Sequence, residues 1–244
     1  MTMRMSEHQA EIVSPGTGAK PMSSALRIPT GIEGLDAMIE GGLIRGDMHL
    51  LAGAPGTGKT ILAATFAFNA VTKQKEKVVY ATFEESTEYL IRNLKKLGVD
   101  LSSAERSGGL SVIDLDALKG KELETNIQML IEAVKETKST ILIIDSLTAL
   151  LLATESKFEL RAFMKSVYKT LKNQGITTLM TISQTPGAGF GIEGFVADSV
   201  MLLENVVDKD QFKTRLIIMK MRGTEHSKRY HTVSFAPKMS VSKY

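Results

Sequence analysis

The chain has 244 residues, a length that α/β proteins often reach in one domain. Its 30 lysines and arginines nearly balance 27 acidic residues, so a net charge of +3 does not by itself indicate a nucleic-acid-binding protein. The absence of cysteine excludes disulfides and thiolate metal sites, and no stretch approaches the ~20 apolar residues of a membrane-spanning helix. Since the first residues also lack the apolar core of a secretory signal, we expect a cytoplasmic protein without membrane contact.

The first part of the chain is polar, with scattered Ser, Gly and Pro and no apolar period. We predict that residues 1–25 form a flexible N-terminal tail and that residues 26–244 form a single domain. A short helix is expected over residues 31–40, ending at Gly41 and Gly42. The apolar run at 48–52 predicts a buried strand, and the alanine-rich run at 61–70 predicts a buried helix.

Between this strand and this helix, residues 53–60 read GAPGTGKT and fit the phosphate-binding pattern G-x-x-x-x-G-K-[ST]. Glycines let the backbone curl so that successive N–H groups surround phosphate oxygens, and the start of the helix adds positive potential. The lysine can reach the outer phosphates, and the threonine hydroxyl can bind Mg²⁺. We therefore predict a site for nucleotide phosphates formed by Ala54, Pro55, Gly56, Thr57, Gly58, Lys59, Thr60 and Ile61.

Strands and helices alternate along the next part of the chain. Strands are expected at 78–83, 110–114, 140–145 and 176–184. Helices are expected after Ser86, ending at Gly98, and around 123–134 and 160–171. This alternation indicates an α/β fold with a mainly parallel central sheet flanked by helices. Strand-like runs without intervening helices predict antiparallel strands at one edge of the sheet, at 199–204, 215–221 and 231–235.

Polar residues stand at the carboxyl ends of three of these strands, where ligands bind in open α/β sheets. Asp145 follows four apolar residues and is predicted to hold Mg²⁺ through its water shell and to hydrogen-bond Thr60. Glu84, supported by Glu85, is the predicted catalytic base for the attacking water. Gln184 closes the fifth strand, at the base of a glycine-rich loop, and is predicted to contact the γ-phosphate.

A second informative stretch begins at residue 220 and reads KMRGTEH; from there onward the chain has six Lys or Arg and one Glu. Lys220 and Arg222 alternate along a predicted strand and therefore share one face. The rigid fork of arginine suits the charge that develops on a phosphate during its transfer. From spacing alone, a solvated basic edge is the other interpretation of this pair. His49, inside the first strand, is interpreted as a core or strand-face histidine.

Taken together, these motifs resemble the KaiC-type branch of the RecA superfamily of ATPases. The resemblance covers residues 28–235 and rests on TGIEGLD at 30–36, GGL at 41–43, the loop at 53–60, TFEE at 82–85, IDS at 144–146, GFVADSV at 194–200 and KMRGT-x-H at 220–226. It implies a RecA-like P-loop fold. Family members with two domains carry such a set twice, whereas this chain carries it once.

The resemblance also implies roles for individual residues. Six subunits of this family form a ring with ATP and Mg²⁺ at each interface, and the Lys-x-Arg pair acts in trans on the γ-phosphate bound to the neighbour. The implied catalytic residues are Glu84, Glu85, Lys59, Lys220 and Arg222. The implied contacts with the neighbour's nucleotide are Lys220, Met221, Arg222, Thr224 and His226.

Three functions stay open at this point. The first is a Mg²⁺-dependent ATPase that assembles as a regulatory homohexamer, with a possible protein partner. The second is a DNA-binding recombinase paralogue acting in DNA repair, with loops at 150–157 and 185–196 facing the nucleic acid. The second loop has no Lys or Arg and carries Glu193, which argues against strong nucleic-acid binding. The third is a scaffold whose ATP-driven assembly matters more than its turnover.

Overall fold

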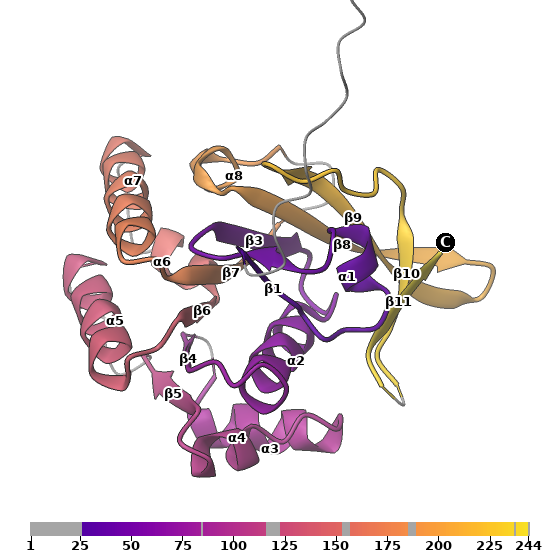
Figure 1. The fold of residues 1–244 in the computed structure, drawn as a ribbon. Helices are drawn as coiled ribbons and strands as arrows, with labels where there is room; N and C mark the ends of the chain where they lie inside the picture. Colours follow the sequence, from indigo (N-terminus) through magenta and orange to yellow (C-terminus); the bar gives the residue numbers. More distant parts are fainter. Residues whose placement is uncertain are drawn as a thin grey trace, which may run out of the picture.

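The computed structural model describes residues 26–83, 85–115, 123–152, 157–184, 189–236 and 238–243. The predicted tail at 1–25 and the predicted base Glu84 lie outside these residues. Within them, helices cover both faces of a large sheet (Figure 1). This arrangement confirms the predicted α/β fold, with a mainly parallel central sheet and antiparallel strands at one edge.

The elements have the following bounds. The strands are β1 (Arg27–Ile28), β2 (Leu43–Ile44), β3 (Met48–Gly53), β4 (Val78–Thr82), β5 (Leu110–Asp114), β6 (Ile141–Asp145), β7 (Thr177–Ser183), β8 (Ser199–Asp208), β9 (Gln211–Met221), β10 (His231–Ser234) and β11 (Ser240–Lys243). The helices are α1 (Leu35–Met38), α2 (Lys59–Thr72), α3 (Thr87–Lys96), α4 (Leu101–Arg106), α5 (Leu123–Thr137), α6 (Leu147–Leu152), α7 (Lys157–Asn173) and α8 (Ile192–Val196). None of the described helices is long and apolar enough to cross a membrane.

The main sheet has the strand order β11-β10-β9-β8-β3-β7-β6-β4-β5. All strands from β8 to β5 are paired in parallel. β9 pairs antiparallel with β8, and β10 and β11 extend the sheet antiparallel beyond it. β3 therefore lies in the middle of the sheet, and the loop that follows it opens at the carboxyl ends of the parallel strands.

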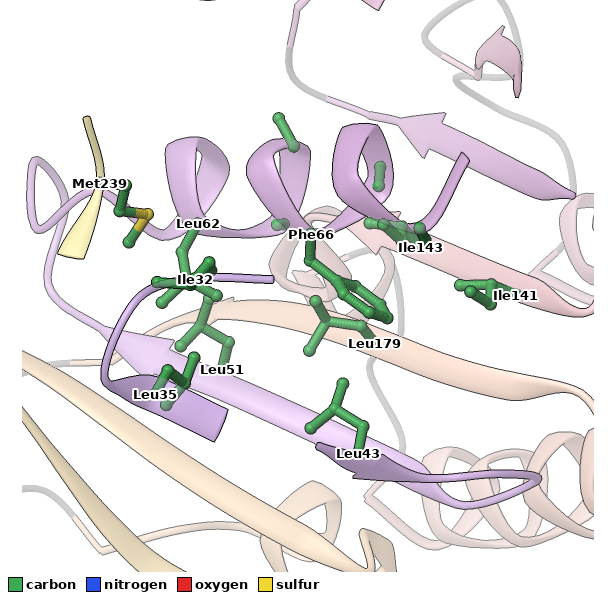
Figure 2. Close-up of a cluster of buried hydrophobic side chains, with 14 of the residues drawn as sticks. Ile32, Leu35, Leu43, Leu51, Leu62, Phe66, Ile141, Ile143, Leu179 and Met239 are labelled. Carbon is green, nitrogen blue, oxygen red and sulfur yellow. The ribbon is translucent and has the colours of Figure 1, made fainter. Parts of the chain in front are cut away.

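Two apolar cores lie on opposite faces of this sheet, because successive residues of a strand point to opposite sides. Leu51 and Ile143 belong to the core beneath α2, which Figure 2 shows, whereas Leu50 and Leu142 belong to the core that includes residues of α5 and α7. Every residue of β3, β4 and β6 is buried. Burial on both faces explains why these strands read as continuous apolar runs in the sequence.

Several short segments differ from the expectations. The helix expected over 31–40 is limited to α1, because Gly34, Glu40, Gly41 and Gly42 have positive φ angles that interrupt it. The apolar pattern does not predict α4 or α6, which have only six residues each. α6 and α8 occupy parts of the two loops expected at 150–157 and 185–196, of which residues 153–156 and 185–188 lie outside the described residues. Ser86 stands at the N-cap of α3 without a side-chain capping hydrogen bond.

Candidate functional site

The glycine-rich loop connects the buried strand β3 to the start of α2, as the motif predicts. Gly56 and Gly58 adopt positive φ angles of 79° and 88°, which glycine reaches without strain. Gly58 is also packed against an aromatic ring, since a Cβ atom there would lie 2.3 Å from Phe235. Thr57 is buried, and its hydroxyl donates to the carbonyl of Ala54 at 2.8 Å. The loop is therefore held in a curled shape from within.

Lys59 and Thr60 begin α2 at the mouth of this loop. The Lys59 side chain is only 8% exposed, and its Nζ donates to the carbonyls of Gly53 at 2.9 Å and Ala54 at 3.1 Å. The ammonium group thus lies against the loop itself, next to the first N–H groups of a 14-residue helix. The Lys59 ammonium group, the N–H groups of the loop and the start of the helix together favour binding of an anion. Around them, Pro55 is exposed and Thr60 and Ile61 are partly buried.

Asp145 closes β6, as the sequence predicts, and its side chain is buried. Its carboxylate accepts hydrogen bonds from the hydroxyls of Tyr80 at 2.6 Å and Thr181 at 2.5 Å. Burial and the adjacent carboxylate raise the pKa of Tyr80 well above its usual value, so the phenol stays a donor. The described hydrogen bonds of the Asp145 carboxylate therefore come from the neighbouring strands β4 and β7, and the expected bond with Thr60 is not among them.

The structure brings two further predicted residues to the same edge of the sheet. Gln184 follows β7, and its backbone N–H donates to the carbonyl of Gly53 at 3.1 Å, so this residue lies beside the phosphate loop. Glu85 follows β4 with an exposed side chain, and its carbonyl accepts from the hydroxyl of Thr82 at 3.0 Å. Glu84, the expected catalytic base, lies outside the described residues.

Lys220 and Arg222 lie near the amino ends of the parallel strands β3 and β8, opposite the carboxyl ends where the phosphate loop begins. Gly53 pairs with Leu203 of β8, whereas Lys220 pairs with Val200, three residues earlier on the same strand. The backbone N–H of Arg222 donates to Asp198, which precedes β8. At roughly 3.3 Å per residue, the pair is about 10–17 Å from the start of the phosphate loop along the strand direction. Within one chain, the two predicted parts of the site are thus not brought together.

The two cationic side chains point to a common set of acceptors, as their alternation predicts. Lys220 Nζ donates to the carbonyls of Ala197 at 2.6 Å, Gly194 at 3.1 Å and Phe195 at 3.3 Å. Arg222 donates to the carbonyl of Phe195 at 3.2 Å and to the carboxylate of Asp198 at 3.1 Å. These contacts do not fit a freely solvated basic edge, although the Arg222 side chain is 52% exposed.

The remaining residues of the KMRGTEH stretch have different surroundings. Met221 lies between the two cations on the strand, so its side chain points the opposite way and is buried in the core; only its backbone is left for the expected nucleotide contact. Thr224 accepts a hydrogen bond from Arg27 at 3.0 Å. The ring of His226 is partly buried and lies 3.1 Å from the carbonyl of Ser227.

Sequence reasoning missed two residues that support this stretch. Arg27 is buried and donates to two backbone carbonyls, to Thr224 and to Glu40, at distances between 2.6 and 3.1 Å. Asp198 binds Arg222 and lies inside the recognised GFVADSV motif, but no local pattern reveals that role. Both act through residues far away in the chain, which spacing cannot reveal.

A cavity of about 300 Å³ lies beside α2. Ile61, Thr65 and Phe68 line it from the helix, and Leu97 and Phe235 line it from other segments. Phe235 is the residue that covers Gly58, so the cavity adjoins the back of the phosphate loop. Its apolar and aromatic lining was not predicted, because the residues come from three separate stretches of the chain.

Comparison with known proteins gives consistent matches. The sequence profile described as "ATPase: KaiC" matches residues 28–241. The circadian clock oscillator protein KaiC of Thermosynechococcus vestitus is 36% identical over 213 residues, which are 83% of this chain and 41% of that protein. The corresponding protein of Synechococcus elongatus is 31% identical over 230 residues, which are 90% of this chain and 44% of that protein. The chain thus spans less than half the length of these relatives.

A solved structure matches over nearly the whole of both chains. The KaiC-like protein of the hyperthermophilic archaeon Pyrococcus horikoshii superposes with a TM-score of 0.80 at 30% sequence identity, covering 88% of this chain and 98% of that protein. On the basis of its sequence profile, its relatives and its fold, the chain belongs to the KaiC-like ATPase family of the RecA superfamily.

Proposed function

We propose that this protein binds ATP with Mg²⁺ and hydrolyses it at the interfaces between the subunits of a ring. The observation that carries the proposal is the position of the two halves of the site. The phosphate loop follows the carboxyl end of β3, whereas Lys220 and Arg222 lie near its amino end. A phosphate bound by one subunit can therefore meet such a cationic pair only from another subunit, which closed rings provide at every interface.

The loop supplies the binding half of the site. The backbone N–H groups of Gly56 and of residues 58–61, at the start of α2, would face the phosphates, and Lys59 would exchange its contacts with Gly53 and Ala54 for phosphate oxygens. The nucleotide's base would enter the adjoining cavity beside α2, where Phe68 and Phe235 offer aromatic surfaces and Ile61 offers an aliphatic one. The cavity thus lies where a nucleotide held by the loop would extend.

The donor set around the loop suits Mg²⁺. Mg²⁺ is usually held by one or two carboxylates together with substrate phosphates and water, rather than by a cage of side chains. Thr60 offers a hydroxyl, and Asp145 offers a buried carboxylate oriented by Tyr80 and Thr181. The described residues contain no cluster of three or more His, Cys, Asp or Glu that could hold a metal by itself, consistent with a cation that arrives with the nucleotide.

The proposed hydrolysis uses a base for the attacking water, a side chain that contacts the γ-phosphate, and positive charge near the transferred phosphate. Glu84, with Glu85 beside it, follows β4 on the same edge and would take the proton of the attacking water. Gln184 lies beside Gly53 and would contact the γ-phosphate. Lys220 and Arg222 of the adjacent subunit would stabilise the negative charge that develops on the transferred phosphate.

Two alternative functions receive less support. The described part of the loop at 189–196 offers no basic side chain, and Glu193 is buried with its carboxylate bonded to the N–H of Gly191. The cations that open the basic C-terminal stretch are bound to α8 and Asp198. No described contact therefore favours nucleic-acid binding, and a pure scaffold would have no use for paired acids at the nucleotide edge.

The proposal is tested by mixing variants that damage opposite halves of the site. Arg222→Ala removes the donor half, and Glu84→Gln or Lys59→Ala removes the acceptor half. We expect each variant alone to lose at least ~100-fold in ATP turnover, measured as phosphate release. An equal mixture of Arg222→Ala with Glu84→Gln should regain about a quarter of wild-type turnover, if subunits mix at random.

The Lys59→Ala mixture serves as an independent acceptor-side test, and a mixture of Glu84→Gln with Lys59→Ala is the control that must stay inactive. If the Arg222→Ala variant hydrolyses ATP at the wild-type rate, or if neither mixture regains activity, then the proposed shared site is wrong.

A further inference from the structure

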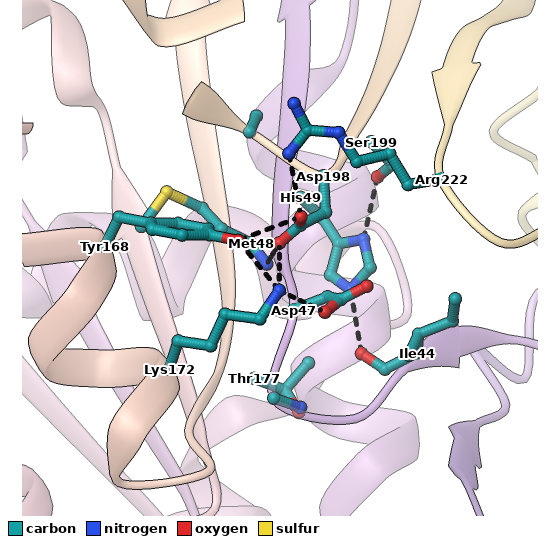
Figure 3. Close-up of polar contacts among 12 residues, drawn as sticks. Ile44, Asp47, Met48, His49, Tyr168, Lys172, Thr177, Asp198, Ser199 and Arg222 are labelled. Carbon is teal, nitrogen blue, oxygen red and sulfur yellow. Dashed lines mark hydrogen bonds and ion pairs between the residues drawn. The ribbon is translucent and has the colours of Figure 1, made fainter. Parts of the chain in front are cut away.

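We propose that Asp198 is a positioning residue that holds the Lys220–Arg222 pair in the orientation required to meet the nucleotide of the adjacent subunit. This inference rests on the proposed function. Asp198 stands between α8 and β8, directly beside the pair, and its side chain is only 5% exposed. Figure 3 shows its carboxylate at the centre of contacts from several elements.

The carboxylate of Asp198 is fixed by three donors other than Arg222. It accepts from the backbone N–H of Met48 at 3.1 Å, from the hydroxyl of Tyr168 at 3.1 Å and from Nζ of Lys172 at 3.3 Å. These donors come from β3 and α7, two elements of the packed core. A carboxylate held from both sides gives Arg222 a rigid anchor 3.1 Å away.

The backbone of Asp198 completes this anchor. Its N–H donates to the carbonyl of Met48 at 2.8 Å, and its carbonyl accepts from the N–H of Arg222 at 3.0 Å. Arg222 is therefore tied to β3 through both the main chain and the side chain of one residue. On the other cation, the adjoining carbonyl of Ala197 accepts from Lys220 at 2.6 Å.

The exposure of the Arg222 side chain indicates that its ion pair with Asp198 orients the guanidinium more than it stabilises the fold. Because its side chain is half exposed, its ion pair with Asp198 contributes little to folding. A guanidinium has five N–H donors, and the described contacts with Asp198 and Phe195 use two of its nitrogens, one donor each. The remaining donors can bind phosphate oxygens while the anchor holds, which is what a preoriented cation in a subunit interface requires.

Charge gives Asp198 a second effect on the pair. Burial lowers the pKa of Lys220, the neighbouring Arg222 lowers it further, and Asp198 raises it. Burial alone would raise the pKa of Asp198, but the N–H of Met48, the charge of Lys172 and the hydrogen bond from Arg222 outweigh burial and lower the pKa, so the carboxyl stays ionised. Asp198 is thus the counter-charge that lets two cations stay side by side.

Asp198→Asn tests the inference because it keeps the shape and removes the charge. We expect ATP turnover to fall roughly 10–100-fold, with a smaller change in KM, because the pair is misplaced rather than lost. Mixed with Glu84→Gln, the variant should regain activity; mixed with Arg222→Ala, it should not. This behaviour places the damage in the donor half of the interface. A general loss of structure would damage both halves and give no rescue with either partner.

Asp47→Asn is the matched control. Asp47 also binds Lys172, at 3.0 Å, but has no described contact with Arg222. We expect its turnover to stay within about twofold of wild type. If Asp198→Asn does not fold, Tyr168→Phe takes its place. It removes one donor to the carboxylate and the hydroxyl that accepts from Lys172 at 2.7 Å, and leaves the carboxylate itself in place. A loss of a few-fold with the same pattern of rescue is then expected.

The outcomes separate the two claims. Wild-type turnover in Asp198→Asn and in Tyr168→Phe overturns the positioning role, and so does a defect rescued by Arg222→Ala instead of Glu84→Gln. If Arg222→Ala and Glu84→Gln do not complement each other, the shared-site proposal itself fails. If Arg222→Ala and Glu84→Gln complement each other, but Asp198→Asn is not rescued by Glu84→Gln, only the positioning role of Asp198 fails.

Discussion

His49 is a titratable side chain buried in the middle of the sheet. Its Nδ1 lies 2.7 Å from the hydroxyl of Ser199, and its Nε2 donates to the carbonyl of Ile44 at 3.1 Å. Burial lowers its pKa below the usual 6.5, although the carbonyl of Ile44 and the acids Asp47 and Asp198 oppose this effect. The neutral ring therefore belongs to the folded state, as expected for a core histidine.

This burial predicts a pH dependence of stability. As pH falls below 6.5, the unfolded chain takes up a proton at this residue before the folded chain does, so the free energy of unfolding decreases. Between pH 7.5 and 5.5 the loss due to His49 can reach at most about 1.4 kcal/mol, the limit for a site that takes up its proton only in the unfolded chain. Urea unfolding at both pH values should show this loss in the wild type, and a smaller loss in His49→Gln. The pKa of His231 is lowered by burial too, so part of the dependence should persist.

At the level of residues, sequence predicts contacts that are local and misses those that are not. The phosphate loop could be predicted because its glycines, Lys59 and Thr60 act within eight consecutive residues. The role of Arg27 could not be predicted, because it depends on a hydrogen bond to Thr224, 197 positions away. Asp198 likewise depends on Met48 and Lys172, 150 and 26 positions away. The orienting residues of a site are therefore the part that required the structure.

Among the elements, α1 shows how one glycine fixes the packing of two segments. Gly34 precedes α1 with φ 81°, and a Cβ atom there would lie 1.8 Å from the carbonyl oxygen of Val241 in β11. The N–H of Val241 donates to the carbonyl of Glu33 at 2.8 Å, so the two backbones are in direct contact. Gly41 has a comparable φ of 99° but nothing within 4 Å.

The two glycines give a matched pair of substitutions. Gly41→Ala should cost about 1–3 kcal/mol through backbone strain alone. Gly34→Ala carries the same strain and also pushes β11 away from α1, so its loss in the free energy of unfolding should be larger by at least ~1 kcal/mol. Denaturant unfolding of both variants measures the difference. Equal losses would mean that close backbone packing at Gly34 does not matter.

Elements with strong apolar patterns were predictable, and short ones were not. The strands β3, β4 and β6 lie where their apolar runs predict them, because burial on both faces leaves a continuous signal. α4 and α6 span less than two turns each, too short for a helical period to be visible. The antiparallel strands were expected from their lack of intervening helices, whereas the register that sets Lys220 beside Val200 had no sequence signal.

For the whole molecule, the strand order determines what one subunit can do alone. The chain returns from β7 through α8 to the other side of β3, so β8 and β9 bring the cationic pair next to the strand that carries the phosphate loop, but at its far end. The resulting subunit has a phosphate-binding edge and a separate cationic edge. In the proposed function these two edges meet head to tail between neighbouring subunits, an arrangement that can close into a ring.

Light scattering with and without saturating Mg-ATP gives the mass of the particle in solution, and this mass tests most directly whether the site is shared between subunits. We expect the 26.6 kDa chain to form a hexamer when Mg-ATP is bound. In the Arg222→Ala variant this assembly should be weaker, while the phosphate loop still binds nucleotide. A wild-type chain that binds Mg-ATP tightly and remains a monomer would contradict the proposed site between subunits.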